Sequence, residues 1–134
     1  MAGTIVADDI QHSTAGSVGT EYVVSGSVKY WGTNNGSGTV SVRDSLNQSS
    51  ITDRGTGLYT MSMSSAFSNA NHSQSGGVRK DDSNDDGNLV IQVGGHSLYS
   101  PTSSEMRAHL NRRGGTTDRQ DSDYVFTQSI GDLA

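Results

Sequence analysis

The segment Gly57-Leu58-Tyr59-Thr60-Met61-Ser62-Met63-Ser64 alternates with a period of two. Tyr59, Met61 and Met63 fall on one side, and Leu58 falls on the other side with Thr, Ser and Ser. Successive side chains of a β-strand point to opposite faces of the sheet, so the pattern predicts a strand with one buried, apolar face and one polar face in water. The preceding Asp53-Arg54-Gly55-Thr56-Gly57 predicts a hairpin turn, because glycine adopts the positive φ that tight connections need.

Similar short runs of β-branched and aromatic residues recur about every ten residues and are bounded by Gly, Asn, Asp or Ser. Such spacing is typical of a sandwich or barrel of antiparallel strands. The predicted strands are residues 28–31, 39–43, 50–52, 58–63, 89–93, 96–99 and 124–130. The glycine-containing stretches 34–38 and 113–115 predict further turns.

Residues 101–114 fit two structures. Their Ser/Thr start, good helix formers, basic residues near the end and following glycine are typical of a short helix. The same stretch also alternates, with Met106, Ala108 and Leu110 on one side and polar residues on the other, as in a strand with one wet face. These residues alone leave helix and strand equally open.

The first 27 residues have small apolar patches separated by Ser, Thr, Gly and Ala, too sparse to close a core. We expect an extended arm, residues 1–27, that docks on a partner, followed by a head domain, residues 28–134. The side chains expected to make the assembly contacts are Ile5, Val6, Ile10, Val18, Tyr22, Val23 and Val24.

The composition fits one domain with a thin core. The chain has 134 residues, 31% of them apolar and 6% aromatic, and 17 glycines. So little apolar material favours a protein that is stable as an oligomer. The net charge of −5 and the absence of a basic stripe argue against a nucleic-acid partner. No cysteine is present, and no apolar stretch predicts a secretion signal or membrane insertion.

Several blocks resemble a module found in structural proteins of tailed bacteriophages, especially tail-fibre and fibre-like virion proteins of aquatic phages. The blocks are GTVSVRDSLNQSSITDRGTGLYT at 38–60, AFSNAN at 66–71, DYVFTQSIGD at 123–132, and GTI and HSTAGS at 3–5 and 12–17. Together they cover nearly the whole chain. Two segments depart from the family pattern: residues 74–87 are more acidic, and residues 31–33 lack the fuller aromatic and Asn run.

The resemblance implies an all-β fold, a small antiparallel, jelly-roll-like β-sandwich, in which residues 105–111 form a strand. It implies a virion structural protein of the tail-fibre type, a homotrimer on the tail or capsid surface whose arm contacts other virion proteins. A capsid decoration protein or tail connector without a receptor role is the alternative. Host-surface glycan is a candidate partner, and no residue is assigned to receptor binding.

Motifs for chemistry are scarce. Asp82, Asn84 and Asp86 match the start of a calcium loop that ends in Gly87, but the twelfth position is Val93 instead of Glu, and a solvated acidic loop is the simpler interpretation. The chain has no G-x-S-x-G elbow or phosphate-binding glycine motif, and its four histidines are scattered. We therefore expect no enzymatic activity, catalytic residue or cofactor.

The large aromatic side chains allow two interpretations. Each could fill the core, which a chain so poor in apolar residues needs. Each could instead lie on the surface and stack on the CH groups of a sugar. Core filling is the favoured expectation for seven of the eight aromatic residues, which are Tyr30, Trp31, Tyr59, Phe67, Tyr99, Tyr124 and Phe126.

Overall fold

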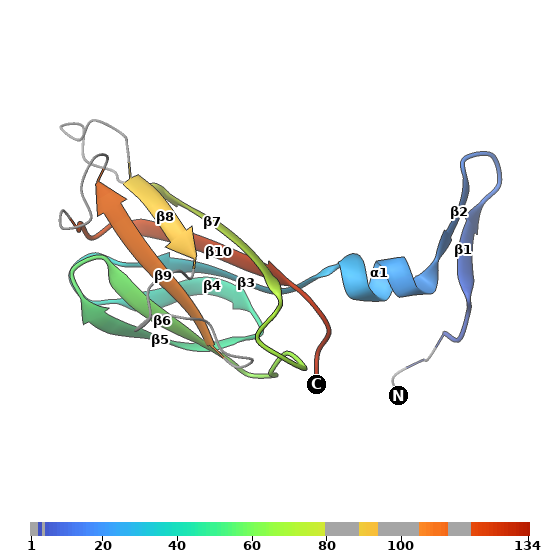
Figure 1. Ribbon diagram of the computed structural model, residues 1–134, viewed down its shortest axis with the longest axis horizontal. Coiled ribbons are helices and arrows are strands. Elements are labelled where there is room, and N and C mark those ends of the chain that lie inside the picture. Colours follow the sequence, from blue (N-terminus) through green and yellow to red (C-terminus); the bar gives the residue numbers. More distant parts are fainter. Residues whose placement is uncertain (1–2, 4, 80–88, 94–104, 113–118) are drawn as a thin grey trace.

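The computed structural model describes residues 3, 5–79, 89–93, 105–112 and 119–134, with strands β8 and β9 described by their backbone. An arm at the N-terminus leads into a two-layered β-domain (Figure 1). The arm contains β1 (Asp9–His12), β2 (Gly16–Gly19) and helix α1 (Thr20–Gly26). The domain contains β3 (Val28–Asn35), β4 (Ser41–Leu46), β5 (Gln48–Gly55), β6 (Leu58–Met63), β7 (Ser73–Arg79), β8 (Leu89–Val93), β9 (Glu105–Arg112) and β10 (Tyr124–Ile130).

Two four-stranded antiparallel sheets face each other, which confirms the predicted all-β sandwich. One sheet has the order β4-β3-β10-β7 and the other β5-β6-β9-β8. Consecutive strands pair in β3–β4, β5–β6 and β8–β9, while β10 returns from the C-terminal end to lie between β3 and β7. β9 is a strand and not a helix, since it pairs with β6 on one side and β8 on the other. This settles the ambiguity of residues 105–111 in favour of β structure.

The chain passes from one sheet to the other between β4 and β5 through the single residue Asn47. Asn47 has a φ of 61°, a left-handed conformation that Asn tolerates better than most residues. Its side-chain amide donates to the carbonyl of Ser65 at 2.9 Å, and its side-chain oxygen accepts the Ser65 N–H at 2.7 Å. The sharp corner is therefore held by its own side chain.

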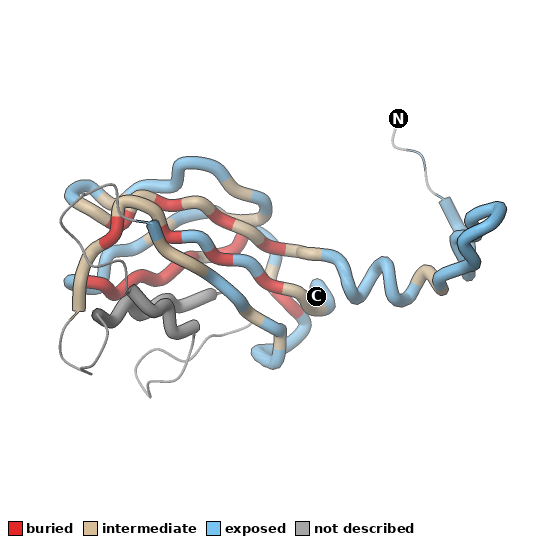
Figure 2. Tube along the Cα trace, turned by 90° about the horizontal axis from the view of Figure 1, so that it is seen from above, coloured by how far each residue is buried: buried red, intermediate tan, exposed pale blue. Residues whose placement is uncertain are grey.

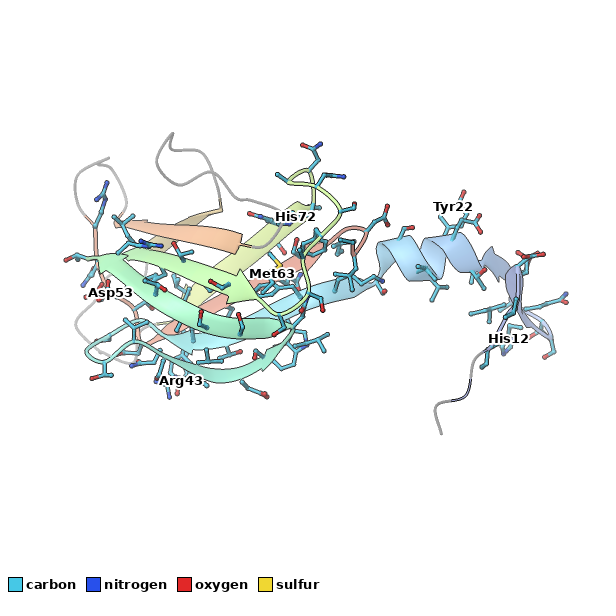
Figure 3. All side chains as sticks on the ribbon, turned by 90° about the horizontal axis from the view of Figure 1, so that it is seen from below. His12, Tyr22, Arg43, Asp53, Met63 and His72 are labelled. Atoms are coloured by element: carbon cyan, nitrogen blue, oxygen red, sulfur yellow. The ribbon has the colours of Figure 1, made fainter. Side chains whose placement is uncertain are left out.

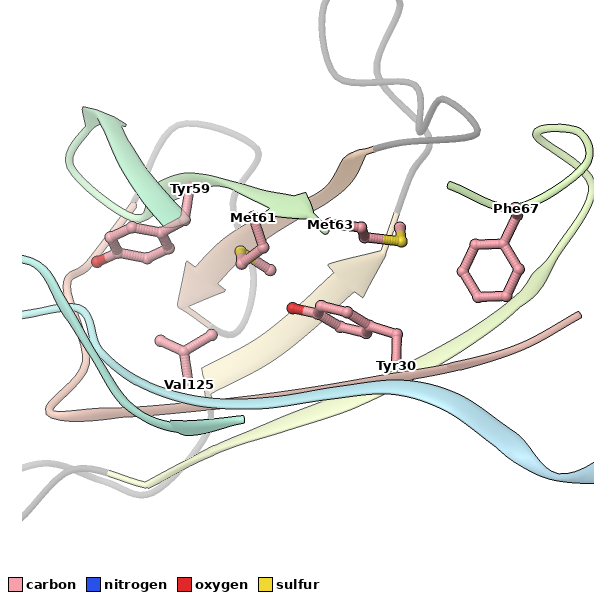
Figure 4. Close-up of a cluster of buried hydrophobic side chains, with 6 residues drawn as sticks. All are labelled: Tyr30, Tyr59, Met61, Met63, Phe67 and Val125. Carbon is pink, nitrogen blue, oxygen red and sulfur yellow. The ribbon is translucent and has the colours of Figure 1, made fainter. Parts of the chain in front are cut away.

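The core lies between the sheets and is built from few side chains in the described part of the chain. Tyr30 and Val125 from one sheet meet Tyr59, Met61 and Met63 of β6, with Phe67 closing one end (Figure 4). Buried positions alternate with exposed ones along β10, as one-sided burial requires (Figure 2). The apolar face predicted for β6 is thus confirmed.

The polar face predicted for β6 is only partly in water: Ser64 is exposed and Ser62 half-buried, but for Leu58 and Thr60 the prediction was wrong. Thr60 is 2% exposed and Leu58 is also buried. Arg54, at the end of β5, lies across this face and donates from Nε to the Thr60 hydroxyl at 3.3 Å. Because β6 is a central strand, a long side chain from its neighbour can cover its outer face.

A chain of hydrogen-bonded polar side chains lies beside the core, between β3 and β10 of one sheet and Gln48 at the start of β5 in the other. The Tyr30 hydroxyl donates to Gln48 Oε1 at 2.9 Å and lies 3.0 Å from the Thr127 hydroxyl. The Gln48 amide in turn donates to Asn34 Oδ1 at 2.6 Å. Gly32 makes the space for this arrangement, since a Cβ there would lie 1.9 Å from Gln48 Oε1. The hydrogen bonds satisfy polar groups that burial would otherwise penalise.

The predicted bounds of β6, β8 and β10 agree with the structure, whereas β3 and β5 are longer than predicted and β4 is shifted. Four elements were not predicted: β7 in the sandwich, and β1, β2 and helix α1 in the arm, which is a hairpin and a short helix where an extended segment was expected. The turns at 34–38 and 53–57 follow β3 and β5, and Gly38, Gly55 and Gly57 have positive φ. The predicted strand at 96–99 and turn at 113–115 lie outside the described residues.

Candidate functional site

The arm begins with a small hairpin. β1 pairs with β2 so that Ile10 lies opposite Val18, and both are exposed. The turn is organised by His12, whose Nδ1 accepts the N–H groups of Thr14 at 3.2 Å and Ala15 at 3.1 Å, before Gly16 takes a φ of 96°. An isolated two-stranded hairpin is only marginally stable in water, so this one gains little from its own pairing.

Helix α1 follows directly and is seven residues long, with no buried residue. Its N-cap, Gly19, makes no side-chain capping bond. At the other end the Lys29 ammonium donates to the carbonyl of Val24 and to the Ser27 hydroxyl. A helix this short does not persist in water without tertiary contacts. Tyr22 points away from the chain into solvent (Figure 3) and is 70% exposed.

All seven apolar side chains predicted to make assembly contacts are exposed in the single chain. Ile5 and Val6 are each 93% exposed, and the other five range from Val18 and Val23 at 42% to Tyr22. They lie on the part of the chain that projects from the sandwich (Figure 1). An isolated exposed apolar residue is ordinary, but such a concentration on one projecting element is typical of an interaction surface.

The outer face of the β4-β3-β10-β7 sheet carries the second group of exposed large side chains. β10 turns Val125, Thr127 and Ser129 inward, and Phe126 and Gln128 are exposed on the opposite face. In register, Phe126 lies beside Thr33 of β3 and Gly77 of β7, while Gln128 lies beside Trp31 and Ser75. Leu46 of the edge strand β4 extends this face beyond Trp31 and is also exposed.

Tyr124 is held between two arginines at the end of this face. The guanidinium carbon of Arg79 lies 4.1 Å and that of Arg43 4.4 Å from its ring centroid. Arg43 also donates to Asn35 Oδ1 and to the carbonyl of Asp123, both at 3.2 Å. Tyr124 stacks on Phe126 with 6.0 Å between ring centroids. These cation–π and ring contacts fix the orientation of both aromatic rings.

The seven aromatic side chains for which core filling was expected divide between the two interpretations. Tyr30, Tyr59 and Phe67 are buried, which confirms core filling for them. For Phe126, which is 37% exposed, core filling was wrong, and Trp31 and Tyr124 are only half-buried on the same outer face. Tyr99 lies outside the described residues.

Two buried tyrosines have perturbed acidities. Burial raises the pKa of Tyr30 to about 12. Burial, reinforced by the neighbouring Asp121 carboxylate, raises the pKa of Tyr59 well above its usual range. The Tyr59 hydroxyl lies 2.5 Å from the carbonyl of Gly36 and 2.8 Å from Asp121 Oδ1. A tyrosine kept neutral in this way is a poor nucleophile or general base, and the contacts serve to connect β6 to the opposite sheet.

The candidate calcium ligands Asp82, Asn84 and Asp86 lie outside the described residues. Within the described part of the chain, no group of three or more His, Cys, Asp or Glu side chains is placed to hold a metal ion. Of the histidines described with their side chains, His12 organises the arm hairpin. His72 stacks on Phe67 with 4.3 Å between ring centroids, and its Nδ1 lies 2.6 Å from the Ser129 hydroxyl.

Sequence reasoning did not single out Gln128, Ser75 or Gly77, which share the outer face with Trp31 and Phe126. A usable signal was present in β10, where Tyr124, Phe126 and Gln128 alternate with smaller residues. Extending the same alternation to Trp31 and Thr33 would have placed them on one face.

Among the described residues, no helix has the length and apolar character needed to cross a membrane. Comparisons with protein-family models, with curated protein sequences and with solved structures found no match for this chain.

Proposed function

We propose that this chain is a structural subunit of a tailed-phage particle, of the fibre-like type, that assembles through its N-terminal arm and displays its β-sandwich. The observation that carries the assembly role is the exposure of seven apolar side chains on an arm that has no core of its own. The sequence blocks at 38–60, 66–71 and 123–132 supply the link to phage virion proteins.

Burial of the exposed apolar side chains would favour association through the arm. Burying an exposed Val, Ile or aromatic side chain stabilises by roughly 1.5–3 kcal/mol. Seven such side chains per chain make a gain comparable with the roughly 4–15 kcal/mol that association costs. A second copy of the same arm is a suitable partner, because hairpin β1–β2 and helix α1 would bury each other's apolar side chains. The arm also carries Asp8, Asp9 and Glu21 and no Lys or Arg, so this packing would have to leave the three carboxylates in solvent. We expect three copies around one axis, as the resemblance to fibre proteins implies.

The proposal is tested in a phage that encodes this chain, by comparing particles with the intact gene and particles whose product lacks residues 5–24. We expect the full chain in purified particles, as a projecting density in electron micrographs, and loss of that density from the arm-deleted particles. A matched control, Gly77→Leu on the sandwich surface, should retain the density. Absence of the full chain from purified particles would refute the virion role, and arm-deleted particles that keep the density would refute attachment through the arm.

A further inference from the structure

The outer face of the β4-β3-β10-β7 sheet contains a groove with a volume of about 410 Å³. This volume is within the range of small-molecule sites. Its lining is contributed by three neighbouring strands and includes Trp31, Thr33, Ser75, Gly77, Phe126 and Gln128. The groove lies on the side of the sheet away from the core, so the arm contacts of the proposed function neither use it nor explain it.

Gly77 keeps this groove open. In the register of β7 and β10 it lies beside Phe126, at a position where any other residue would project from the same face. A Cβ built on Gly77 meets no atom within 4 Å, and its φ is outside the left-handed region. Neither packing nor backbone conformation therefore requires glycine at this position, and a side chain there would occupy the groove.

The lining combines flat apolar surfaces with neutral hydrogen-bonding groups. Trp31 and Phe126 provide aromatic rings, and the Tyr124 contact orients the Phe126 ring. Gln128 offers an amide that both donates and accepts, and Thr33 and Ser75 offer hydroxyls. None of the described lining residues is charged, which disfavours phosphate, sulfate or other strongly ionic ligands.

We infer that this groove binds a neutral saccharide, with a sugar ring placed against Phe126 and Trp31 and its hydroxyls hydrogen-bonded by Gln128, Thr33 and Ser75. A pyranose has this dual character, since its CH groups form an apolar patch that suits an aromatic face, while its hydroxyls require donors and acceptors around its rim. A purely apolar ligand would leave the amide and the hydroxyls of the groove without partners. Saccharide binding would supply the surface contact that distinguishes a fibre from a connector.

The chain carries its own reporter, because Trp31 is the only tryptophan of the sequence. The experiment titrates the full chain with methyl glycosides of glucose, galactose, mannose and N-acetylglucosamine and records Trp31 fluorescence, with sorbitol as an acyclic control. An array of neutral oligosaccharides extends the search. We expect a saturable change in emission with at least one glycoside or array saccharide and none with sorbitol.

Variants locate the binding. Gly77→Leu should weaken saccharide affinity at least tenfold, whereas the matched Gly3→Leu, also built into open space, should leave it unchanged. Phe126→Leu should lose at least fivefold, because it keeps the apolar volume but not the flat ring, and Phe126→Tyr should remain within threefold. Unfolding midpoints of all four variants verify that the sandwich is intact.

No response to any saccharide would overturn the inference. Saccharide binding that Gly77→Leu leaves intact would overturn it as well. These results would not affect the proposal of assembly through the arm, because that proposal is tested on phage particles and on the oligomeric mass of the purified chain.

Discussion

Replacing Tyr59 by Phe removes a hydroxyl that connects the two sheets at one end of the sandwich. The hydroxyl lies 2.5 Å from the carbonyl of Gly36, which follows β3, and 2.8 Å from Asp121, which precedes β10. Asp121 keeps one donor in the variant, since the Gly57 N–H lies 2.7 Å from the same oxygen. The variant therefore loses mainly the hydroxyl contact, and the buried Gly36 carbonyl is left without this hydrogen-bond donor. Such losses cost about 1–3 kcal/mol, so we expect Tyr59→Phe to destabilise the fold by about 2 kcal/mol.

The assay is urea unfolding followed by Trp31 fluorescence, at one fixed protein concentration because association shifts apparent stability. A lower midpoint with an unchanged slope against urea identifies a loss of stability without a change in the surface exposed on unfolding. The matched control is Tyr22→Phe, whose ring is 70% exposed and which should stay within about 0.5 kcal/mol of the parent. If Tyr59→Phe is equally neutral, its hydroxyl does not hold the sheets together.

Three further predictions concern the sandwich. The pKa of Tyr30 is about 12 in the fold against 10.0 in the unfolded chain, so the stability that the neutral, buried Tyr30 contributes is complete below pH 10, and about 3 kcal/mol of it is lost as the pH rises through 12. Tyr30→Phe should make the urea midpoint decline less steeply over this pH range, and parallel curves for parent and variant would contradict the prediction. Gly36→Ala places a Cβ 2.8 Å from the Tyr59 ring and 2.9 Å from the Ser122 carbonyl, so the thermal unfolding midpoint should fall by several degrees. Gly77→Ala adds a Cβ in open space and should leave the midpoint unchanged. Equal midpoints for the two variants would contradict the close packing of Gly36 against Tyr59. Asn47→Gly keeps the positive φ but loses two side-chain hydrogen bonds, so the free energy of unfolding in urea should fall by about 1–2 kcal/mol. Asn47→Ala should lose about 1 kcal/mol more, because alanine disfavours the positive φ. If Asn47→Gly is the less stable of the two, the positive φ is not the constraint at this position.

The strands that could be predicted from the sequence are those whose alternation is strong. β6 carries aromatic or apolar residues at every second position, β10 begins with Tyr124, Val125 and Phe126 and ends with Ile130, and both strands were placed to the residue. β7 was missed because Ser73-Gln74-Ser75-Gly76-Gly77 has the composition of a loop. It is a strand because β10 supplies a full ladder of backbone pairing along its length, which is a tertiary effect that no local window contains.

The same distinction applies to the candidate sites. The arm could be recognised because its apolar residues are isolated among Ser, Thr and Gly, and all seven are exposed. The groove could not be recognised in full, since Trp31 and Ser75 are 44 positions apart and meet only through their common neighbour β10. The covering of β6 by Arg54 depends likewise on the pairing of β5 with β6.

The most direct test of the central claim, that the chain assembles through its N-terminal arm, is sedimentation equilibrium of the purified full chain across a range of concentrations. The parent chain should associate, with a mass approaching three times 14.1 kDa, and the double variant Tyr22→Ser, Val24→Ser should remain at the monomer mass while keeping its sandwich folded. A parent chain that stays monomeric at high micromolar concentration, or a double variant that associates as strongly as the parent, would contradict assembly through the arm.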